Sequence, residues 1–135
     1  MKKTYRELTD FINAAALWQG TEKNKDHQNG KFAYAVKKMV KRSNIARERY
    51  FEEVEDVNVK HCSVDSDKNI IQTPQGQYRF TKDAMIERLK ELRTLSEKTI
   101  DIDPFIATVV PDDLTPEEIE AFTDFVIKPP LEVVA

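Results

Sequence analysis

Two adjacent side chains with metal-binding and nucleophilic chemistry, His61 and Cys62, lie near the middle of the chain. Imidazole and thiolate groups are common zinc ligands, and a thiolate beside a base can act as a nucleophile. Neighbouring residues on a helix point about 100° apart, however, so they do not readily share one ion. His27 is the only other histidine, and there is no second cysteine. We therefore expect no metal site here, and we predict that His61 and Cys62 lie at a seam between packed elements.

A short acidic pattern, Asp65-x-Asp67-x-Asn69, matches the first ligands of an EF-hand calcium loop. The sixth position of such a loop would be Ile70, where glycine is needed for the sharp turn. The twelfth would be Gly76, where a bidentate glutamate is needed. The sequence therefore predicts a solvated turn at this point.

No other group of residues has the spacing of a catalytic site. The three glycines, Gly20, Gly30 and Gly76, are too far apart to form a loop that cradles phosphate. Acidic pairs such as Glu117-Glu118 stand where a helix begins, a position that the helix dipole already favours. We expect no catalytic residue, no cofactor and no enzymatic activity.

Basic residues are concentrated between Lys37 and Arg49. On a helix, four of them lie away from the apolar stripe and form a candidate basic face: Lys38, Lys41, Arg42 and Arg49. Such a row could follow the phosphates of a nucleic acid. No aromatic residues alternate with it to stack on bases, and acidic residues follow in the next turns. A solvated helix face is the favoured interpretation, and nucleic-acid binding is the alternative.

The composition indicates one soluble domain. A length of 135 residues suits a single domain over residues 1–135, and the net charge of −3 supplies no general attraction to nucleic acid or to an anionic membrane. One cysteine cannot form an intramolecular disulfide, which fits a reducing compartment. Polar residues interrupt the first apolar stretch, and no run approaches the ~20 apolar residues of a membrane span. We expect a cytoplasmic protein that is not embedded in a membrane.

Hydrophobic spacing predicts the elements that position these residues. A helix is expected from about Thr4 to Gln19, followed by an exposed loop over 21–30. From Lys31 onward an apolar stripe continues at steps of three and four: Phe32, Val36, Met39, Ser43, Ala46, Tyr50, Val54, Val57, His61 and Val64. No Gly or Pro interrupts residues 31–73, so one helix of roughly 30 residues and ~45 Å is predicted. So long a helix needs a helical partner along its length.

That partner is expected after a β-hairpin. Ile70-Ile71 and Gln77–Phe80 flank a Pro-x-Gly turn, and Thr81 then has the position of a helix N-cap. The stripe of this second helix is Met85, Leu89, Leu92, Ser96 and Thr99, flanked by Ile86 and Leu95. An isolated hairpin is marginal in water, so another subunit or a strand over 99–102 should cover it.

The last third of the chain predicts an extended stretch and then a short helix. Thr115 and Glu118 have the spacing of a capping box, with Pro116 at the first helical position. The buried face of this helix is expected to be Ile119, Phe122, Val126 and Ile127, ending at Pro129-Pro130. The predicted fold class is mainly α with a small β-hairpin (α+β): a long antiparallel helical hairpin joined by a β-hairpin, plus shorter N- and C-terminal helices. Its sections are 1–28, 29–100 and 101–135.

Apolar residues outside the helical stripes form a candidate partner interface. Four lie in the hairpin and four in the extended stretch: Ile70, Ile71, Tyr78, Phe80, Phe105, Ile106, Val109 and Val110. For the second four, burial in the core is the favoured interpretation, and the partner interface is the alternative.

The order of these segments resembles a family of small proteins of tailed bacteriophages and prophages. The resemblance rests on NGKFAYAVKKMVKRSNIARERYFEEVED (Asn29 to Asp56), GQYRF (Gly76 to Phe80), the Leu-rich helix and LTPEEIEAF (Leu114 to Phe122), and it spans about Asn29 to Ile127. The outline is also similar to the helix–hairpin–helix of prefoldin. The resemblance implies a phage setting, and no functional residue follows from it.

Together these observations favour a non-enzymatic phage-encoded protein that binds other proteins, as a virion component or assembly factor. Its partners would be copies of itself, forming a homo-oligomer, or a phage structural protein, in the host cytoplasm or the virion. The alternative is a small regulatory or counter-defence protein that binds a host protein or nucleic acid through the basic face.

Overall fold

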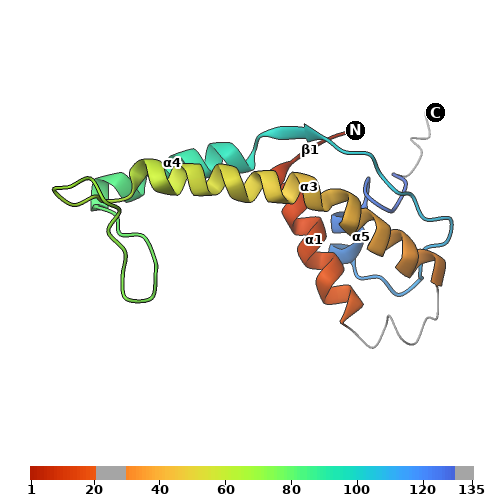
Figure 1. Ribbon diagram of the computed structural model, residues 1–135. Coiled ribbons are helices and arrows are strands. Elements are labelled where there is room, and N and C mark those ends of the chain that lie inside the picture. The colour runs from red at the N-terminus through yellow and green to blue at the C-terminus, as the bar shows by residue number, and fades with distance from the viewer. Residues whose placement is uncertain (21–29, 130–135) are drawn as a thin grey trace. The chain divides into compact units, whose positions relative to one another are not determined.

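The computed structural model describes residues 1–20 and 30–129. Along the chain they form β1 (Lys2–Thr4), α1 (Tyr5–Gln19), α3 (Gly30–His61), α4 (Lys82–Ser96), β2 (Thr99–Asp101) and α5 (Pro116–Phe122), as Figure 1 shows. The described part is mainly helical with one small antiparallel pair of strands, which confirms the predicted α+β class. None of its helices has a stretch long and apolar enough to cross a membrane.

The chain divides into two compact units. Unit 1 consists of residues 1–47 and 99–135, and unit 2 consists of residues 48–98. The boundaries differ from the predicted sections 1–28, 29–100 and 101–135, because the first part of α3 packs with α1 and α5.

Helix α1 begins where the sequence predicts. Thr4 is its N-cap, and the Thr4 hydroxyl accepts a hydrogen bond from the backbone N–H of Glu7. The Glu7 carboxylate in turn accepts from the backbone N–H of Thr4. This reciprocal capping box satisfies two of the backbone donors that a helix leaves free at its start.

The hydrophobic core lies in unit 1, where α1, the first part of α3 and α5 gather (Figure 1). Phe11 stacks on Phe125 and meets Phe122 edge-on, and Trp18 meets Phe32 edge-on. The other large side chains with less than 2% exposure are Leu8, Val36, Met39 and Val126. The first half of the long apolar stripe is therefore buried in this core, and the prediction that a second long helix covers it is wrong.

The strand predicted over 99–102 forms, but with a different partner. β2 pairs antiparallel with β1, with Lys3 opposite Ile100. The prediction that this strand covers the hairpin is therefore wrong. A three-residue strand such as β1 is too short to show a period of two in the sequence.

Helix α5 is shorter than predicted. Thr115 and Glu118 form the expected capping box, but the helix ends at Phe122 because Thr123 is extended and Asp124 has a positive φ of 74°. The backbone N–H groups of Phe125, Val126 and Ile127 then all donate to the carbonyl of Phe122. Phe122 and Val126 are buried as predicted, whereas Ile119 is 45% exposed.

Unit 2 is an antiparallel helical hairpin, in which α4 runs back beside the end of α3 (Figure 1). One ion pair joins the helices, Lys60 to Glu91 at 2.7 Å, and a second joins α3 to the residues just after α4, Glu53 to Lys98 at 2.8 Å. Arg88 Nε also donates to Asn58 Oδ1 at 2.6 Å. The predicted helical hairpin is thus confirmed. The stripe, however, reaches only His61 on α3, because Val64 lies beyond the helix.

The segment between these helices makes two successive turns. Isolated antiparallel bridges close them, Val64 with Ile70 and Gln72 with Tyr78. The second is the predicted Pro-x-Gly turn, with Gly76 at a φ of 80°. We call residues 62–81 the connecting segment.

Candidate interaction surface

The interhelical ion pairs of unit 2 establish which sides of α3 and α4 lie together. Glu53 and Lys60 are seven residues apart and share one side of α3, and their partners are Glu91 on α4 and Lys98, which follows the C-cap of α4. We call these four residues the ionic face. The bonds that Glu91 accepts from Lys60 and then from His61 lower the pKa of its carboxyl, so Glu91 is ionised at neutral pH.

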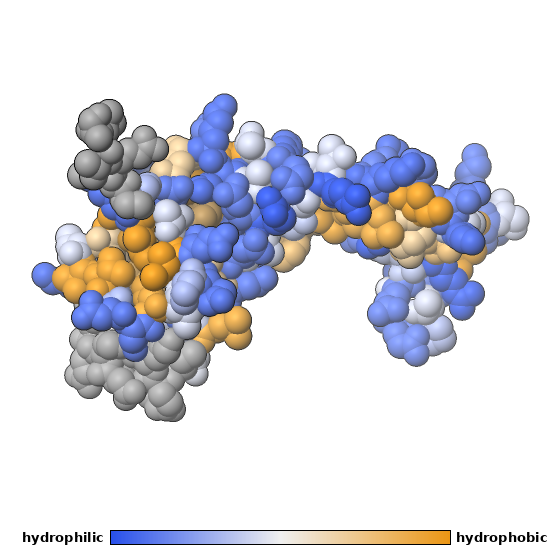
Figure 2. Space-filling model, turned by 180° about the vertical axis from the view of Figure 1, so that it is seen from behind, coloured by the Kyte–Doolittle hydropathy of each residue, from blue (hydrophilic) through white to orange (hydrophobic). Residues whose placement is uncertain are grey.

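The opposite side of the same two helices is apolar. At about 100° per residue, Phe51 lies about 160° from Glu53, and Leu89 and Ile86 lie about 160° and 140° from Glu91. Val54, Met85 and Leu92 lie about 100–120° from these glutamates and border this surface. We call this surface the apolar face, and its members are Phe51, Val54, Met85, Ile86, Leu89 and Leu92. Figure 2 shows hydrophobic side chains at the surface of this unit, between hydrophilic ones.

The apolar face remains open to water. Phe51 is 50%, Leu89 53% and Ile86 47% exposed, while Val54, Met85 and Leu92 are half-buried. The sequence predicts that Leu89 faces α3, whereas the structure turns Arg88 toward α3, where its Nε donates to Asn58 Oδ1. Of the hydrophobic side chains over 48–98, all of which the structure describes, only Cys62 is buried. Unit 2 therefore has no enclosed core of its own.

The connecting segment lies against one end of the apolar face. The Arg88 guanidinium stacks over the Phe80 ring at 4.9 Å, and the Tyr78 hydroxyl donates to the Glu55 carboxylate, which raises the pKa of Tyr78. Between the segment and the helices is a cleft of about 330 Å³, lined by Asn58, Gly76, Gln77, Tyr78, Phe80, Met85 and Arg88. The segment thus lies against the end of the apolar face that contains Met85.

The predicted partner interface is divided between the two units. In unit 2, Ile70 is exposed, whereas Ile71, Tyr78 and Phe80 are half-buried. In unit 1, Phe105 packs edge-on against Tyr34, and the exposed members are Ile106, Val109 and Val110. The eight residues therefore fall into two groups of four, one in each unit.

The predicted basic face is also divided. Lys38, Lys41 and Arg42 lie in unit 1 and Arg49 in unit 2, all exposed. Arg42 is engaged within unit 1, because its guanidinium donates to the carbonyls of Asp103 and Pro104 at 3.1 and 3.0 Å and lies over the Phe105 ring. Lys38 Nζ also lies over a ring, that of Tyr34, at 5.5 Å.

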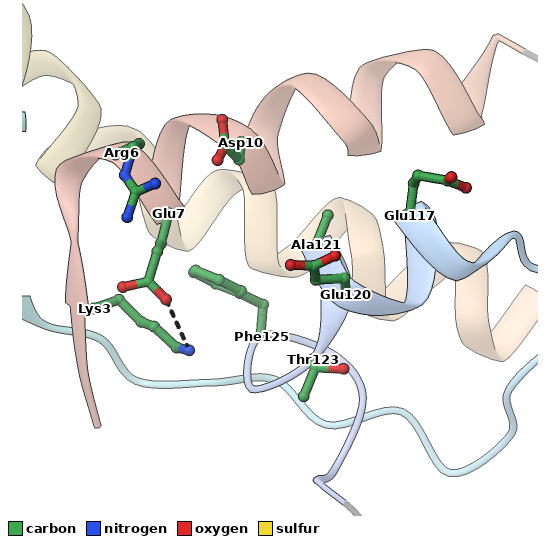
Figure 3. Close-up of a pocket in the computed structure, with 9 residues that line it drawn as sticks. All are labelled: Lys3, Arg6, Glu7, Asp10, Glu117, Glu120, Ala121, Thr123 and Phe125. Atoms are coloured by element: carbon green, nitrogen blue, oxygen red, sulfur yellow. Dashed lines mark hydrogen bonds and ion pairs between the residues drawn. The ribbon is translucent and has the colours of Figure 1, made fainter.

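Unit 1 holds a polar cleft of about 410 Å³ between α1, α5 and the turn that follows α5 (Figure 3). Its lining consists of Lys3, Arg6, Glu7, Asp10, Glu117, Glu120, Ala121, Thr123 and Phe125. Lys3 Nζ lies 3.2 Å from Glu7 and 2.7 Å from Asp124.

These ion pairs determine the protonation of the groups at the base of the cleft. Burial acts to lower the pKa of Lys3, but its hydrogen bonds and attraction to Asp124 and Glu7 raise it overall. Burial likewise acts to raise the pKa of Glu7, but the bonds from Thr4 and Lys3 lower it overall. Glu7 is therefore a carboxylate at neutral pH. Its ion pair with Lys3 joins α1 to β1 and is structural.

The residues with metal or nucleophilic chemistry serve the packing of unit 2. His61 is half-buried with Nε2 2.9 Å from Glu91, and the Cys62 thiol donates to the Val59 carbonyl. Asp65 Oδ1 accepts from the backbone N–H groups of Asp67 and Asn69, which closes the first turn of the connecting segment. Within residues 1–20 and 30–129, no three His, Cys, Asp or Glu side chains gather in a way that could hold a metal ion.

Sequence reasoning missed Phe51 as a surface residue, since it lies beside the stripe that continues through Tyr50 and Val54. The only sign of its exposure in the sequence is its position directly after Tyr50, which places it on the side of α3 that α4 does not cover.

Comparison of the chain with protein families, with curated proteins and with solved structures found no match.

Proposed function

We propose that this chain is a non-enzymatic protein–protein interaction protein, with a structural or assembly role, that binds its partner through the apolar face of unit 2. The observation that carries the proposal is that, among the hydrophobic side chains over 48–98, burial is limited to Cys62. Full burial of a large apolar side chain contributes about 1.5–3 kcal/mol, so Phe51, Ile86 and Leu89 each have roughly 1 kcal/mol still to gain. A partner that covers them would gain that stabilisation.

The lining of the two clefts supports a role without catalysis. Neither cleft is lined by a histidine or cysteine, and Glu7 is held as an ionised carboxylate by Lys3. A general acid would instead need a carboxyl whose pKa lies near the working pH.

The resemblance to small phage and prophage proteins supports the setting. We propose a virion component or an assembly factor, acting in the host cytoplasm or in the virion, whose partner is a copy of itself or another phage protein.

Photo-crosslinking from defined positions tests the surface. A photoreactive residue in place of Leu89, on the apolar face, is expected to give a protein adduct in lysates of phage-producing cells. The matched control places it at Thr94, which is exposed on the same helix toward the ionic face. Adducts from Thr94 and none from Leu89 would contradict the proposal.

The second candidate is a regulatory or counter-defence protein that binds nucleic acid, and the exposure of Lys38 and Lys41 on α3 favours it. A mobility shift that weakens with salt and disappears in Lys38→Glu, Lys41→Glu would support it. Absence of a shift at low salt would remove it.

A further inference from the structure

We infer that unit 1 binds single-stranded nucleic acid on the outward side of α3, with a base stacked on the Tyr34 ring and phosphates bound by Lys38 and Lys41. This inference rests on the second candidate function, because it names the type of strand and the aromatic residue for the same basic surface. It does not involve the apolar face of unit 2.

The part of α3 that belongs to unit 1 is strongly basic. Residues 30–47 contain six lysines and arginines and no aspartate or glutamate, although the whole chain has a net charge of −3. Arg42 is paired with Asp103 and donates to backbone carbonyls, so we leave it out of the site. The side chains of Lys38 and Lys41 are exposed. Positive charge gathered on one surface attracts the phosphates of a nucleic acid.

The structure adds an aromatic ring to this basic surface. Tyr34 precedes Lys38 by four residues and Lys41 by seven, so at about 100° per residue both lysines lie within about 40° of it around α3. The buried residues Phe32 and Met39 lie about 140–160° from Tyr34. The Tyr34 side chain is 52% exposed. An open ring therefore lies beside two lysines on the side of α3 that faces away from the core of unit 1.

Contacts within unit 1 orient the ring. Phe105 packs edge-on against Tyr34 with the ring centroids 5.9 Å apart, and the Arg42 guanidinium lies over Phe105 at 5.4 Å. Lys38 Nζ lies 5.5 Å from the centroid of the Tyr34 ring. A cation–π contact at an exposed site is weak, so a base can take the place of the ammonium on the ring while Lys38 turns to a phosphate.

The combination of an open ring and lysines favours a single strand over other anionic partners. Proteins that bind single strands combine a basic surface with aromatic side chains on which successive bases stack. A duplex presents only the edges of its bases in the grooves, so it offers Tyr34 no base to stack on. A membrane surface would need a wide apolar face beside the lysines. Lys38 and Lys41 lie about 6 and 10.5 Å along α3 from Tyr34, where long side chains reach the phosphates next to a stacked base.

Fluorescence anisotropy with the full chain and a labelled oligothymidine of about 15 nucleotides tests the inference at low salt. The oligonucleotide should bind, and Tyr34→Ala should weaken binding by about tenfold or more because the stacked base loses its platform. The matched control Tyr34→Phe keeps the ring and should bind like the wild type. Emission of the buried Trp18 verifies that both variants are folded. Equal affinities of the two variants would overturn the stacking on Tyr34.

Charge reversal tests the phosphate contacts. Lys41→Glu should weaken binding and make it less dependent on salt, because each phosphate contact on a single strand contributes about 0.7 to the slope of log affinity against log salt concentration. Lys90→Glu, exposed on α4 in unit 2, changes the net charge equally and should leave the affinity and the slope unchanged. Equal losses in the two variants would overturn the placement of the strand on α3.

A duplex of the same length distinguishes this inference from the second candidate function. Weaker binding of the duplex, with no difference between Tyr34→Ala and Tyr34→Phe, is the expected result. Equal binding of duplex and single strand, unaffected by Tyr34→Ala, overturns the inference and leaves nucleic-acid binding standing. Absence of binding to either at low salt, or binding only to vesicles of anionic lipid, overturns both.

Discussion

Phe11 of α1 and Phe125, which follows α5, stack with their ring centroids 4.5 Å apart and their planes 9° from parallel. The two rings come from opposite ends of the chain and are 0% and 2% exposed. Their contact joins the N-terminal helix to the C-terminal turn, and Phe122 packs edge-on against Phe11 beside it. Offset and edge-on pairs of this kind add to the burial of the rings themselves.

Removing the Phe11 ring should therefore destabilise unit 1 strongly. We expect Phe11→Ala to lower the free energy of unfolding by about 3–5 kcal/mol, because it leaves a cavity against two other rings. Leu17→Ala, on the same helix but 74% exposed, should change it by about 0.5 kcal/mol or less. Urea denaturation measures both. Similar losses in the two variants would contradict the placement of the core.

The ion pair of Glu7 should make stability depend on pH in the acidic range. The folded-state pKa of Glu7 is lowered from the usual 4.5, so its contribution is complete above 4.5 and is lost as the pH falls through the lower value. The side chain is 41% exposed, so solvent screening limits the contribution to about 0.5 kcal/mol. Glu7→Gln keeps an acceptor for the Thr4 amide and loses the charge. The variant should be less stable than the wild type at pH 7, with a difference that shrinks in acid.

The matched control for that measurement is Asp10→Asn, on the exposed side of the same helix. If Asp10→Asn and Glu7→Gln changed the acid profile equally, the effect would belong to general charge and not to the pair with Lys3.

Removing glycine from one turn of the connecting segment should lower stability, whereas introducing glycine into the other turn should not. Gly76 has a φ of 80° and a Cβ there would meet no atom within 4 Å, so Gly76→Ala costs only backbone strain, about 1 kcal/mol. Lys68 already has a φ of 66°, so Lys68→Gly should be neutral or slightly stabilising. Exchange of the Thr73 amide hydrogen, which donates to Gln77, reports the effect of Gly76→Ala. Equal effects at both sites would exclude backbone strain as the cause.

Arg88 should stabilise the helical hairpin through two contacts at once. Arg88→Ala removes the bond to Asn58 and the stack on Phe80, and we expect a loss of about 1–2 kcal/mol in the opening free energy of unit 2, measured by hydrogen exchange. Lys90→Ala, exposed on the same helix, is the control and should have little effect.

The ends of several elements could be predicted because local chemistry decides them. The capping boxes at Thr4 and Thr115 place the starts of α1 and α5, and the absence of Gly and Pro inside 31–61 allows one long helix. These signals lie within a few residues of the element that they define.

Features that depend on distant parts of the chain could not be predicted. The stripe of α4 centred on Leu89, yet α4 turns Arg88 toward α3, because the long arginine side chain reaches Asn58 and covers Phe80. The end of α5 at Phe122 depends on the turn at Asp124, whose carboxylate pairs with Lys3 at the other end of the chain. The apolar face could not be predicted for the same reason, because its position depends on which sides of α3 and α4 pack together.

The burial of Trp18 gives the two units different optical signals. It is the only tryptophan in the sequence, and it lies in the core of unit 1 against Phe32. Indole emission on heating or in denaturant therefore follows the melting of unit 1, whereas the far-ultraviolet helical signal follows both units. A helical transition that precedes the emission change would reveal unit 2 unravelling first, and its midpoint should rise with protein concentration if a second copy covers that unit.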